Sequence, residues 1–372
     1  MDKICLIGDT HFSRKAEHPL IKKNIKEGQL AFFDYLIGEL NERNIKTVLF
    51  TGDIHDTRQS INVEALVNTK RLFQTKMKDF DIHIILGNHD MYHENAYDIT
   101  ALELFEDIPN VTVYRKNVTV KTFLNKKWYI FPWIIADRET KVVEFLNKMS
   151  GNSRKVRDNT VMFGHFEMFG INMEGKSVST FGLDPNLYMN AAAHVFSGHY
   201  HGQSITEKGS DKLIYLGSPY PMTFANADQS HGVWILDEDM NMEYIENTIS
   251  PNFKDIWDTD DIDAIESLEN SFVRLHICDT HSKEEEFEIR LKIENKKPIL
   301  IRTMPYSDDR VDDESKPEEQ REANQIMKMN TVSLSEIYME QNTEDLPKLK
   351  LQADVKAAIM NQINIFDETI NS

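Results

Sequence analysis

Residues 84–90 of the 372-residue chain read Ile84-Ile85-Leu86-Gly87-Asn88-His89-Asp90, an apolar run that ends at side chains able to hold a metal and to move protons. A run of Ile and Leu is typical of a buried parallel strand, and Gly87 permits a tight turn where the strand ends. Asn88 and His89 would then lie at the carboxyl end of a strand, where open α/β sheets bind ligands.

Four further short apolar segments end in the same way, at a glycine followed by Asp or His. These turns are Gly8-Asp9-Thr10-His11, Gly52-Asp53-Ile54-His55-Asp56, Gly164-His165 and Gly198-His199-Tyr200-His201. Because the carboxyl ends of parallel strands meet at one edge of a sheet, we expect these side chains to converge. The sequence therefore predicts a cluster of oxygen and nitrogen ligands.

Asp, Asn and neutral His form a donor set that suits Mn²⁺, Fe²⁺ or Zn²⁺ better than Ca²⁺. Two cations about 4 Å apart need a ligand that bridges them, and a carboxylate does so naturally. We expect Asp53 to be that bridge. The other predicted ligands form two groups, with Asp9, His11 and His201 in one and Asn88, His165 and His199 in the other.

His89 follows Asn88 directly and can face a bound phosphate instead of a metal. An imidazole there, steadied by a carboxylate such as Asp90, can bind a phosphoryl oxygen or protonate the leaving oxygen. We expect His89 and Asp90 to be the catalytic residues. Asp56 is expected to fix the tautomer of a ligand histidine without binding a metal itself.

Composition limits the class of protein. No apolar run approaches the ~20 residues of a membrane helix, and the chain opens directly into a strand. Only two cysteines are present, Cys5 and Cys278, so a reducing compartment is expected. We therefore expect a soluble, cytoplasmic protein.

The net charge of −19 argues, taken alone, against a nucleic-acid partner. The acidity belongs mainly to the chain beyond Pro251, however, and two bound cations would offset much of the remainder locally.

Apolar periodicity predicts most elements of the chain. Helices are expected from about Leu20 to Arg43, Val63 to Met77 and Thr140 to Met149, with short helices at 94–106 and 261–270. Strands are expected at 111–115, 117–123, 127–131, 212–216 and 232–236, besides those that end at the metal-type turns. Three alternating segments, 271–278, 285–293 and 298–304, suit a small α+β domain.

Four regions follow from these patterns. A large α/β domain at 1–250 precedes a small domain at 251–306, a solvated acidic linker at 307–322 and a helical region at 323–372. Short amphipathic helices beyond a linker have little core of their own, so their apolar faces suggest a partner.

The five-part series of turns resembles the calcineurin-like metallophosphoesterases over residues 1 to about 236. Within that family, Gly87-Asn88-His89-Asp90, Gly217-Ser218-Pro219 and the lack of a Val-Asp-Arg-Gly extension after Asp53 are similar to the SbcD-type nuclease subunits of double-strand-break repair complexes and their phage relatives. His55 departs from these nucleases, which usually carry an apolar residue there; it could add a polar contact near the site.

The resemblance implies a four-layer α/β/β/α sandwich, an α+β capping domain and a C-terminal helical tail. It also implies an Mn²⁺-dependent DNA exonuclease or endonuclease that uses two metal ions at double-stranded DNA ends, in a repair and recombination complex. Its tail would dock on an SbcC-like coiled-coil ATPase, within a heterotetramer containing a homodimer whose face lies near 63–105. If the chain belongs to a phage, its compartment is the host cytoplasm.

Two other functions stay open. One is a phosphoesterase that acts on small nucleotides or phosphoproteins, and the other is a non-catalytic scaffold. Retention of all seven predicted ligands speaks against the scaffold.

Other residues receive plainer interpretations. We expect His194 to be structural and the remaining histidines to be surface or loop residues, namely His18, His83, His93, His231, His276 and His281. Arg14, Lys15 and the cluster Lys22, Lys23 and Lys26 could line a path for DNA, although a solvated helix face is the default. Phe166, Met168 and Phe169 could wedge DNA ends, but packing beneath the site is favoured.

Overall fold

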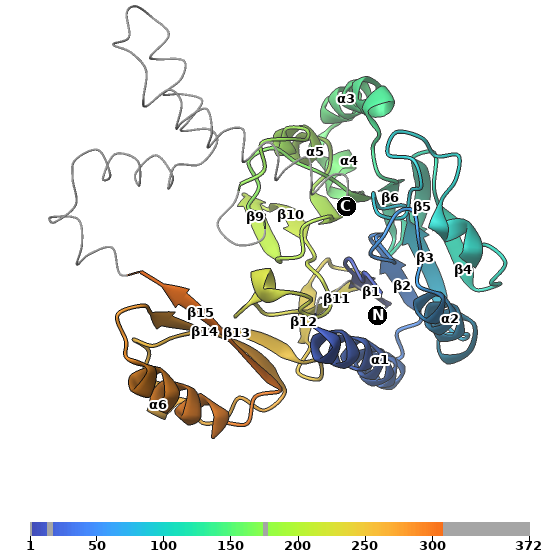
Figure 1. Ribbon diagram of the computed structural model, residues 1–372. Helices are drawn as coiled ribbons and strands as arrows, with labels where there is room; N and C mark the ends of the chain where they lie inside the picture. Colours follow the sequence, from blue (N-terminus) through green and yellow to red (C-terminus); the bar gives the residue numbers. More distant parts are fainter. Residues whose placement is uncertain (1, 13–17, 174–177, 308–372) are drawn as a thin grey trace, which may run out of the picture. The chain divides into compact units, whose positions relative to one another are not determined.

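The computed structural model describes residues 2–12, 18–173 and 178–307 (Figure 1). Residues 1–277 and 281–305 form one compact unit. The predicted acidic linker beyond residue 307 and the predicted helical region at 323–372 lie outside the described residues. None of the helices in the described ranges combines the length and apolarity that a membrane crossing requires.

The first sheet has six strands in the order β12-β11-β1-β2-β3-β4. Its strands are β1 (Lys3–Ile7), β2 (Thr47–Phe50), β3 (Asp81–Ile85), β4 (Val111–Tyr114), β11 (Gly232–Asp237) and β12 (Met242–Glu246). Strands β1 to β4 pair in parallel, whereas β11 and β12 run antiparallel. The carboxyl ends of β1, β2 and β3 therefore share one edge.

The second sheet also has six strands, in the order β5-β6-β7-β8-β10-β9. Its strands are β5 (Thr119–Phe123), β6 (Lys126–Phe131), β7 (Thr160–His165), β8 (His194–Gly198), β9 (Ser204–Lys208) and β10 (Asp211–Tyr215). The four central strands pair in parallel, and β5 and β9 add antiparallel edges.

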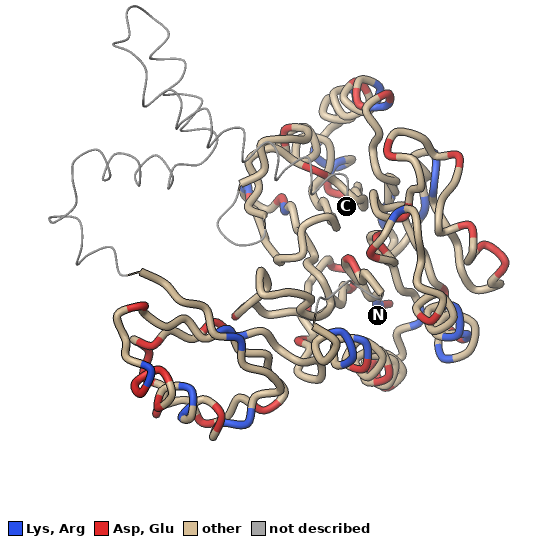
Figure 2. Tube along the Cα trace, viewed as in Figure 1, with Lys and Arg blue, Asp and Glu red and all other residues tan. Residues whose placement is uncertain are grey.

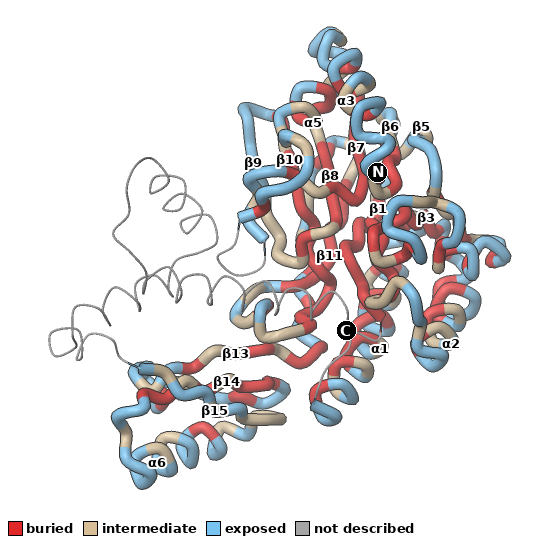
Figure 3. The backbone as a smooth tube through the Cα atoms, turned by 45° about the horizontal axis from the view of Figure 1, so that its top comes forward, coloured by how far each residue is buried: buried red, intermediate tan, exposed pale blue. Residues whose placement is uncertain are grey.

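Apolar side chains on both faces of the strands hold these layers together. Leu6 and Leu49 of the first sheet pack against Trp128, Phe163 and Phe196 of the second. Burying one such side chain contributes about 1.5–3 kcal/mol to stability. Figure 3 shows the central strands β1, β8 and β11 mostly buried, whereas the edge strands β5 and β9 are largely exposed.

Helices form the two outer layers of the sandwich, and one further helix belongs to the small domain. They are α1 (Pro19–Glu42), α2 (Val63–Arg71), α3 (Ala136–Ser150), α4 (Arg154–Asp158), α5 (Pro185–Ala191) and α6 (Lys283–Glu294). Helices α1 and α2 pack on the outer face of the first sheet, and α3 and α5 on that of the second. The predicted four-layer α/β/β/α sandwich is confirmed.

Two of the predicted helices form only in part. Within 94–106 only Ala101–Phe105 is helical, as a 3-10 helix, because a bridge between Met91 and Thr100 closes the preceding residues into a loop. Within 261–270 only the 3-10 turn Ile262–Ala264 forms, and the N–H of Leu268 then bonds to Lys296. A third 3-10 helix spans Phe224–Asn226, and α2 continues as a π-helix over Leu72–Lys76.

The segment 285–293, which alternates like a strand, is helix α6. Ser282 and Glu285 form a capping box at its start. Ile289 and Ile293 are four residues apart and pack into the small core, whereas Phe287 is exposed. The alternation of apolar residues fits a strand, and the spacing of Ile289 and Ile293 fits a helix. The capping box of Ser282 and Glu285 favours the helix.

The small domain contains a three-stranded sheet in the order β13-β14-β15. Its strands are β13 (Asn252–Trp257), β14 (Ser271–Cys278) and β15 (Leu300–Tyr306). Helix α6 covers one face through Ile293. Phe253 and Phe272 on the other face pack against Ile21 and Ile25 of α1. The residue boundaries of the four regions stay a prediction.

Two of the histidines expected on the surface or in loops are buried, His83 on a strand and His231 in a loop. His83 lies on β3, where its Nδ1 is 2.8 Å from the Tyr114 hydroxyl and its Nε2 is 3.0 Å from Asp81 Oδ2. The Nδ1 of His231 is 3.0 Å from Ser218 Oγ. Polar partners make both buried rings tolerable.

Candidate metal centre

The predicted ligands follow directly from strand ends. Asp9, Asp53 and Asn88 come after β1, β2 and β3 of the first sheet. His165 ends β7 and His199 follows β8 of the second sheet. Because β1 and β2 pair in parallel, as do β2 with β3 and β7 with β8, these turns gather at one end of the sandwich.

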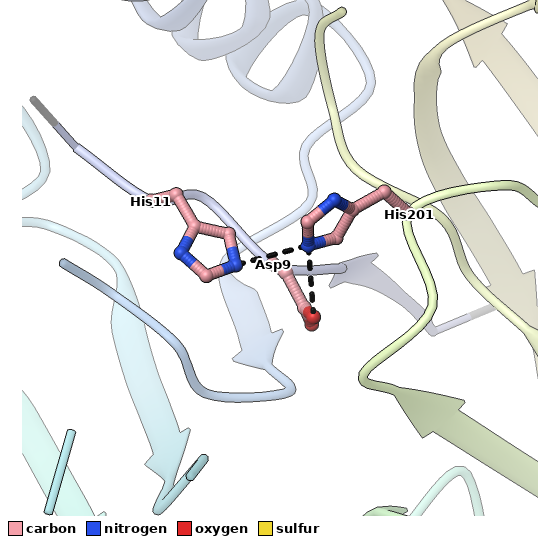
Figure 4. A group of neighbouring side chains, drawn as sticks. All are labelled: Asp9, His11 and His201. Carbon is pink, nitrogen blue, oxygen red and sulfur yellow. Dashed lines mark hydrogen bonds and ion pairs between the residues drawn. The ribbon is translucent and has the colours of Figure 1, made fainter. Parts of the chain in front are cut away.

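The first group consists of Asp9, His11 and His201 (Figure 4). His201 Nε2 lies 3.0 Å from His11 Nε2 and 4.0 Å from Asp9 Oδ2. One potential ligand atom from each of the three residues lies within 4.8 Å of the others. Two imidazole nitrogens and a carboxylate facing one small space suit a borderline divalent cation.

The second group joins Asp9 and Asp53 to His165. His165 Nε2 lies 3.4 Å from Asp53 Oδ2 and 2.9 Å from Asn88 Oδ1. His199 Nδ1 lies 3.2 Å from the same Asn88 oxygen. The structure thus brings Asn88, His165 and His199 together with Asp53.

The hydrogen bond of His165 Nδ1, the ring nitrogen that faces away from the cluster, shows whether this group fits a metal. The Nδ1 atom is 2.8 Å from the carbonyl oxygen of Thr51 and donates to it. This bond fixes the orientation of the ring and turns Nε2 toward Asn88 and Asp53, so that Nε2 would offer its lone pair to a metal ion that takes the place of its proton. Metal-binding histidines characteristically donate their second N–H to such a group, so the residues present fit a metal.

Asp53 lies between the two groups. Its Oδ2 is 3.6 Å from His11 Nε2 and 3.4 Å from His165 Nε2, while its Oδ1 accepts the N–H of His89 at 2.8 Å. Its φ of 48° places the backbone in the left-handed region, which is uncommon for Asp. This position suits the bridging role predicted for it.

Buried charge dominates the electrostatics. Burial raises the pKa of Asp9. Burial alone would lower the pKa of His165, but the carboxylates of Asp53 and Asp9 raise it to about 10. Burial opposes ionisation of Asp53, whereas His165, His89 and His11 hold its pKa well below the usual range. Nearby positive charge would stabilise these buried carboxylates, and divalent cations supply such charge.

His89 is held by a residue other than the one expected. Its Nδ1 lies 2.7 Å from the backbone carbonyl oxygen of Asp56, to which it donates, and its ring centroid is 4.9 Å from that of His11. The ring therefore stands beside the cluster. The Asp56 carboxylate lies 3.7 Å from His11 Nδ1, which suits the predicted tautomer-fixing role.

Asp90 does not steady His89, which corrects that expectation. Its two oxygens accept three backbone N–H groups, from Asp53 at 2.8 Å, Ile54 at 2.9 Å and Gly87 at 2.9 Å. Burial and the charge of Asp53 raise the pKa of Asp90 to about 8, while the N–H groups of Gly87 and Ile54 lower it. Asp90 is thus a positioning residue for the metal-binding turns.

His55 lies away from the cluster. It is buried, its ring stacks on Phe105 at 5.9 Å, and its Nε2 is 3.4 Å from the Thr69 hydroxyl. Burial lowers its pKa to about 4. It takes the place of an apolar residue in the layer beneath α2 and makes no polar contact with the site.

Sequence reasoning missed two residues beside the cluster. Glu167 Oε1 lies 3.8 Å from His199 Nε2, and the Trp133 ring centroid lies 5.1 Å from that of His199. Glu167 has a sequence signal, since it comes two residues after His165, whereas Trp133 is brought to the site by the parallel pairing of β6 with β7.

The other proposed DNA contacts have mixed outcomes. Phe166 and Met168 are buried in the core, as favoured, whereas Phe169 is exposed. Lys26 pairs with Glu64 at 2.7 Å, and both signs of charge occur along α1 (Figure 2). Arg14 and Lys15 lie outside the described residues, so a lysine-lined path stays a prediction.

Residues 2–203 match the family model of the calcineurin-like phosphoesterases. The chain belongs to this family. The expectation of a metal-dependent phosphodiesterase is thereby confirmed, and divalent metal ions are its cofactors.

This phosphoesterase also has similar relatives. Exonuclease subunit 1 of Enterobacteria phage T4 is 28% identical over 249 residues, which cover 66% of this chain and 68% of that protein. Similar solved structures include GAP50, the anchor in the inner membrane complex of Plasmodium, with 12% identity, a TM-score of 0.43 and coverage of 82% of this chain and 97% of that one. A dimetal phosphatase from Danio rerio has 14% identity, a TM-score of 0.38 and coverage of 67% and 99%.

Proposed function

We propose that this phosphoesterase is an Mn²⁺-dependent DNA nuclease, the exonuclease and endonuclease subunit of an SbcCD-like repair and recombination complex. The observation that carries the proposal is the convergence of seven ligand-type side chains from five strand ends around Asp53. The relationship to a phage exonuclease subunit supports DNA as the substrate.

The donor set supports Mn²⁺ as the metal. Asp9, His11, Asp53 and His201 would hold one ion, and Asp53, Asn88, His165 and His199 the other. Carboxylate, amide and imidazole ligands without thiolate favour a cation of intermediate hardness. Two such ions stabilise the charge that develops on the phosphoryl oxygens during in-line displacement.

The chain's own contribution is positioning and proton handling. Because His89 Nδ1 donates to the carbonyl oxygen of Asp56, the Nε2 atom of His89 is available to a phosphoryl or leaving oxygen. Asp90 holds the turns of Asp53 and Asn88 in register through its three N–H contacts. These roles support phosphodiester hydrolysis at the cluster.

Substrate comparison tests the function. Full-length protein with Mn²⁺ is expected to release nucleotides from linear duplex DNA, and to turn over cyclic nucleotides and phosphopeptides far more slowly. Asp53→Asn should abolish cleavage, whereas Asp79→Asn, an exposed turn residue, should keep it. Activity confined to the small substrates would replace the nuclease with the phosphoesterase alternative. If the protein failed to bind Mn²⁺ stoichiometrically, the non-catalytic scaffold would be favoured.

The proposed partner is an SbcC-like coiled-coil ATPase bound through residues 323–372, within a heterotetramer built on a homodimer of this chain. Deleting 323–372 is expected to abolish co-purification with that ATPase while preserving simple nuclease activity. Unchanged co-purification would refute this docking segment.

A further inference from the structure

A cavity of about 170 Å³ opens beside the metal centre. His165 and Trp133 form part of its wall, and Tyr188, Glu139 and Leu183 line other parts. One water occupies about 30 Å³ of liquid, so the cavity has room for a ring-sized group.

Trp133 links this cavity to the metal centre. Its ring centroid lies 5.1 Å from that of His199 and 5.7 Å from that of His165, and both histidines contact the amide oxygen of Asn88. A phosphodiester bound at the metal centre would therefore place one of its two nucleosides beside Trp133.

The charged side chains that line the cavity limit the kind of ligand it can bind. Glu94, Glu139 and Glu167 line the cavity, and Arg58 Nη1 lies 3.6 Å from Glu94 Oε1. Three carboxylates against one paired guanidinium repel a second phosphate. They accept hydrogen bonds from a neutral group that carries N–H donors.

The hydroxyl of Tyr188 is an independent sign of a missing ligand. Tyr188 is fully buried, and its ring packs against Phe166 at 4.5 Å. Within the part of the chain that the structure describes, its hydroxyl has no hydrogen-bond partner. Leaving a buried hydroxyl unpaired is costly, and a group in the cavity would relieve that cost.

We propose that this cavity binds the nucleobase of the nucleotide next to the scissile phosphate. Trp133 supplies an aromatic ring and Leu183 an apolar wall, while Glu139 and Tyr188 supply hydrogen-bonding groups for the base edge. Adenine, cytosine and guanine carry amino donors that suit these acceptors, whereas thymine has no exocyclic amine. The inference rests on the proposed function, since it places a nucleotide at the metal centre.

Binding of mononucleotides to full-length, Mn²⁺-loaded protein tests the cavity directly. Titration calorimetry should compare the four deoxynucleoside 5′-monophosphates with deoxyribose 5-phosphate, which lacks a base. Stacking on an aromatic side chain predicts that the base adds about tenfold or more in affinity. Adenine, cytosine and guanine nucleotides should bind more tightly than the thymine nucleotide.

Two variants test whether the extra affinity provided by the base depends on the cavity. Tyr188→Phe and Glu139→Gln each change a hydrogen-bonding group and leave the Trp133 ring in place. Each should therefore lower the gain severalfold and leave the affinity for deoxyribose 5-phosphate unchanged. Glu144→Gln, on the exposed side of the same helix α3, is the matched control and should bind like the native protein. Thermal unfolding should show that Tyr188→Phe remains folded.

The outcomes separate this inference from the proposed function. Equal affinity for nucleotides and deoxyribose 5-phosphate, or a base-dependent gain that is undiminished in both variants, would overturn the inference even if duplex DNA is cleaved. If the gain is present and reduced in both variants while duplex DNA is not hydrolysed, the nucleobase site stands and the nuclease function fails. Where DNA is cleaved, a terminal abasic nucleotide should raise KM more in the native protein than in the variants.

Discussion

The carboxylate of Asp90 accepts the backbone N–H of Asp53 at 2.8 Å, so one buried aspartate sets the position of another that lies 37 residues earlier. The same carboxylate holds the N–H groups of Ile54 and Gly87. Asp53 has a φ of 48°, a conformation that this triple contact helps to maintain. The predicted metal centre therefore depends on a residue that is not itself one of the predicted ligands.

Asp90→Asn is expected to weaken both folding and metal binding. An amide has one acceptor oxygen, so its NH₂ group must face one of the three N–H donors. The loss should cost about 1–3 kcal/mol of unfolding free energy and lower Mn²⁺ affinity by roughly 10- to 100-fold. Urea denaturation and calorimetric titration with Mn²⁺ measure the two effects. Native Mn²⁺ affinity in a folded variant would show that Asp90 does not position the ligands.

Gly87→Ala should damage the site more than the fold. A Cβ atom at Gly87 would overlap with Asp53 Oδ1 and lie 2.5 Å from its backbone nitrogen. Mn²⁺ binding and hydrolysis should therefore fall at least tenfold, as for other displaced ligand supports. Gly38→Ala, in α1 with open space around the new Cβ, should stabilise the protein by about 0.5–1 kcal/mol and leave binding unchanged. Equal metal affinity in the two variants would contradict the close packing of Gly87 on Asp53.

His89→Ala is expected to keep both metal ions and lose most hydrolysis. The ring is held by the Asp56 carbonyl oxygen and stands beside His11 without joining the ligand groups. Loss of a proton-handling imidazole typically lowers the rate by about 10²–10⁴-fold. Metal analysis by mass spectrometry, run beside single-turnover cleavage, separates the two roles. A variant that binds one ion fewer would make His89 a ligand.

The seven proposed ligands share a local sequence signal, because each lies at or just beyond the end of an apolar strand. Asp90 shows where such reasoning stops. Its partners Ile54 and Gly87 come from two different turns, and only the pairing of β2 with β3 brings them together. Asp90 follows His89 in the sequence, and proximity in sequence alone predicts that it contacts His89. In the structure it accepts backbone N–H groups instead.

Helix α6 and Trp133 illustrate two other limits. The spacing of Phe287, Ile289, Leu291 and Ile293 fits a strand and a helix equally, and burial of Ile289 and Ile293 together became visible only in three dimensions. Trp133 lies beside the metal centre because β6 pairs with β7 in parallel. The residues next to Trp133 in the sequence include no potential metal ligand, so no sequence motif marks it.

Removing the His194 imidazole should reduce the sensitivity of folding to acid. Burial, with Lys126 and Lys212 nearby, lowers the pKa of His194 from 6.5 to about 4, while Asp211 and Asp158 oppose the shift. As pH falls below 6.5 the unfolded chain therefore takes up this proton first, and stability is lost down to about pH 4, where the folded protein also binds it. With an allowance for partial exposure, the loss between pH 7 and pH 5 should be about 1–2 kcal/mol. Urea denaturation at both pH values, with EDTA present so that metal binding does not contribute, should show a smaller loss in His194→Asn than in the native protein. An identical loss in the two proteins would mean that His194 takes up its proton equally in the folded and unfolded chains.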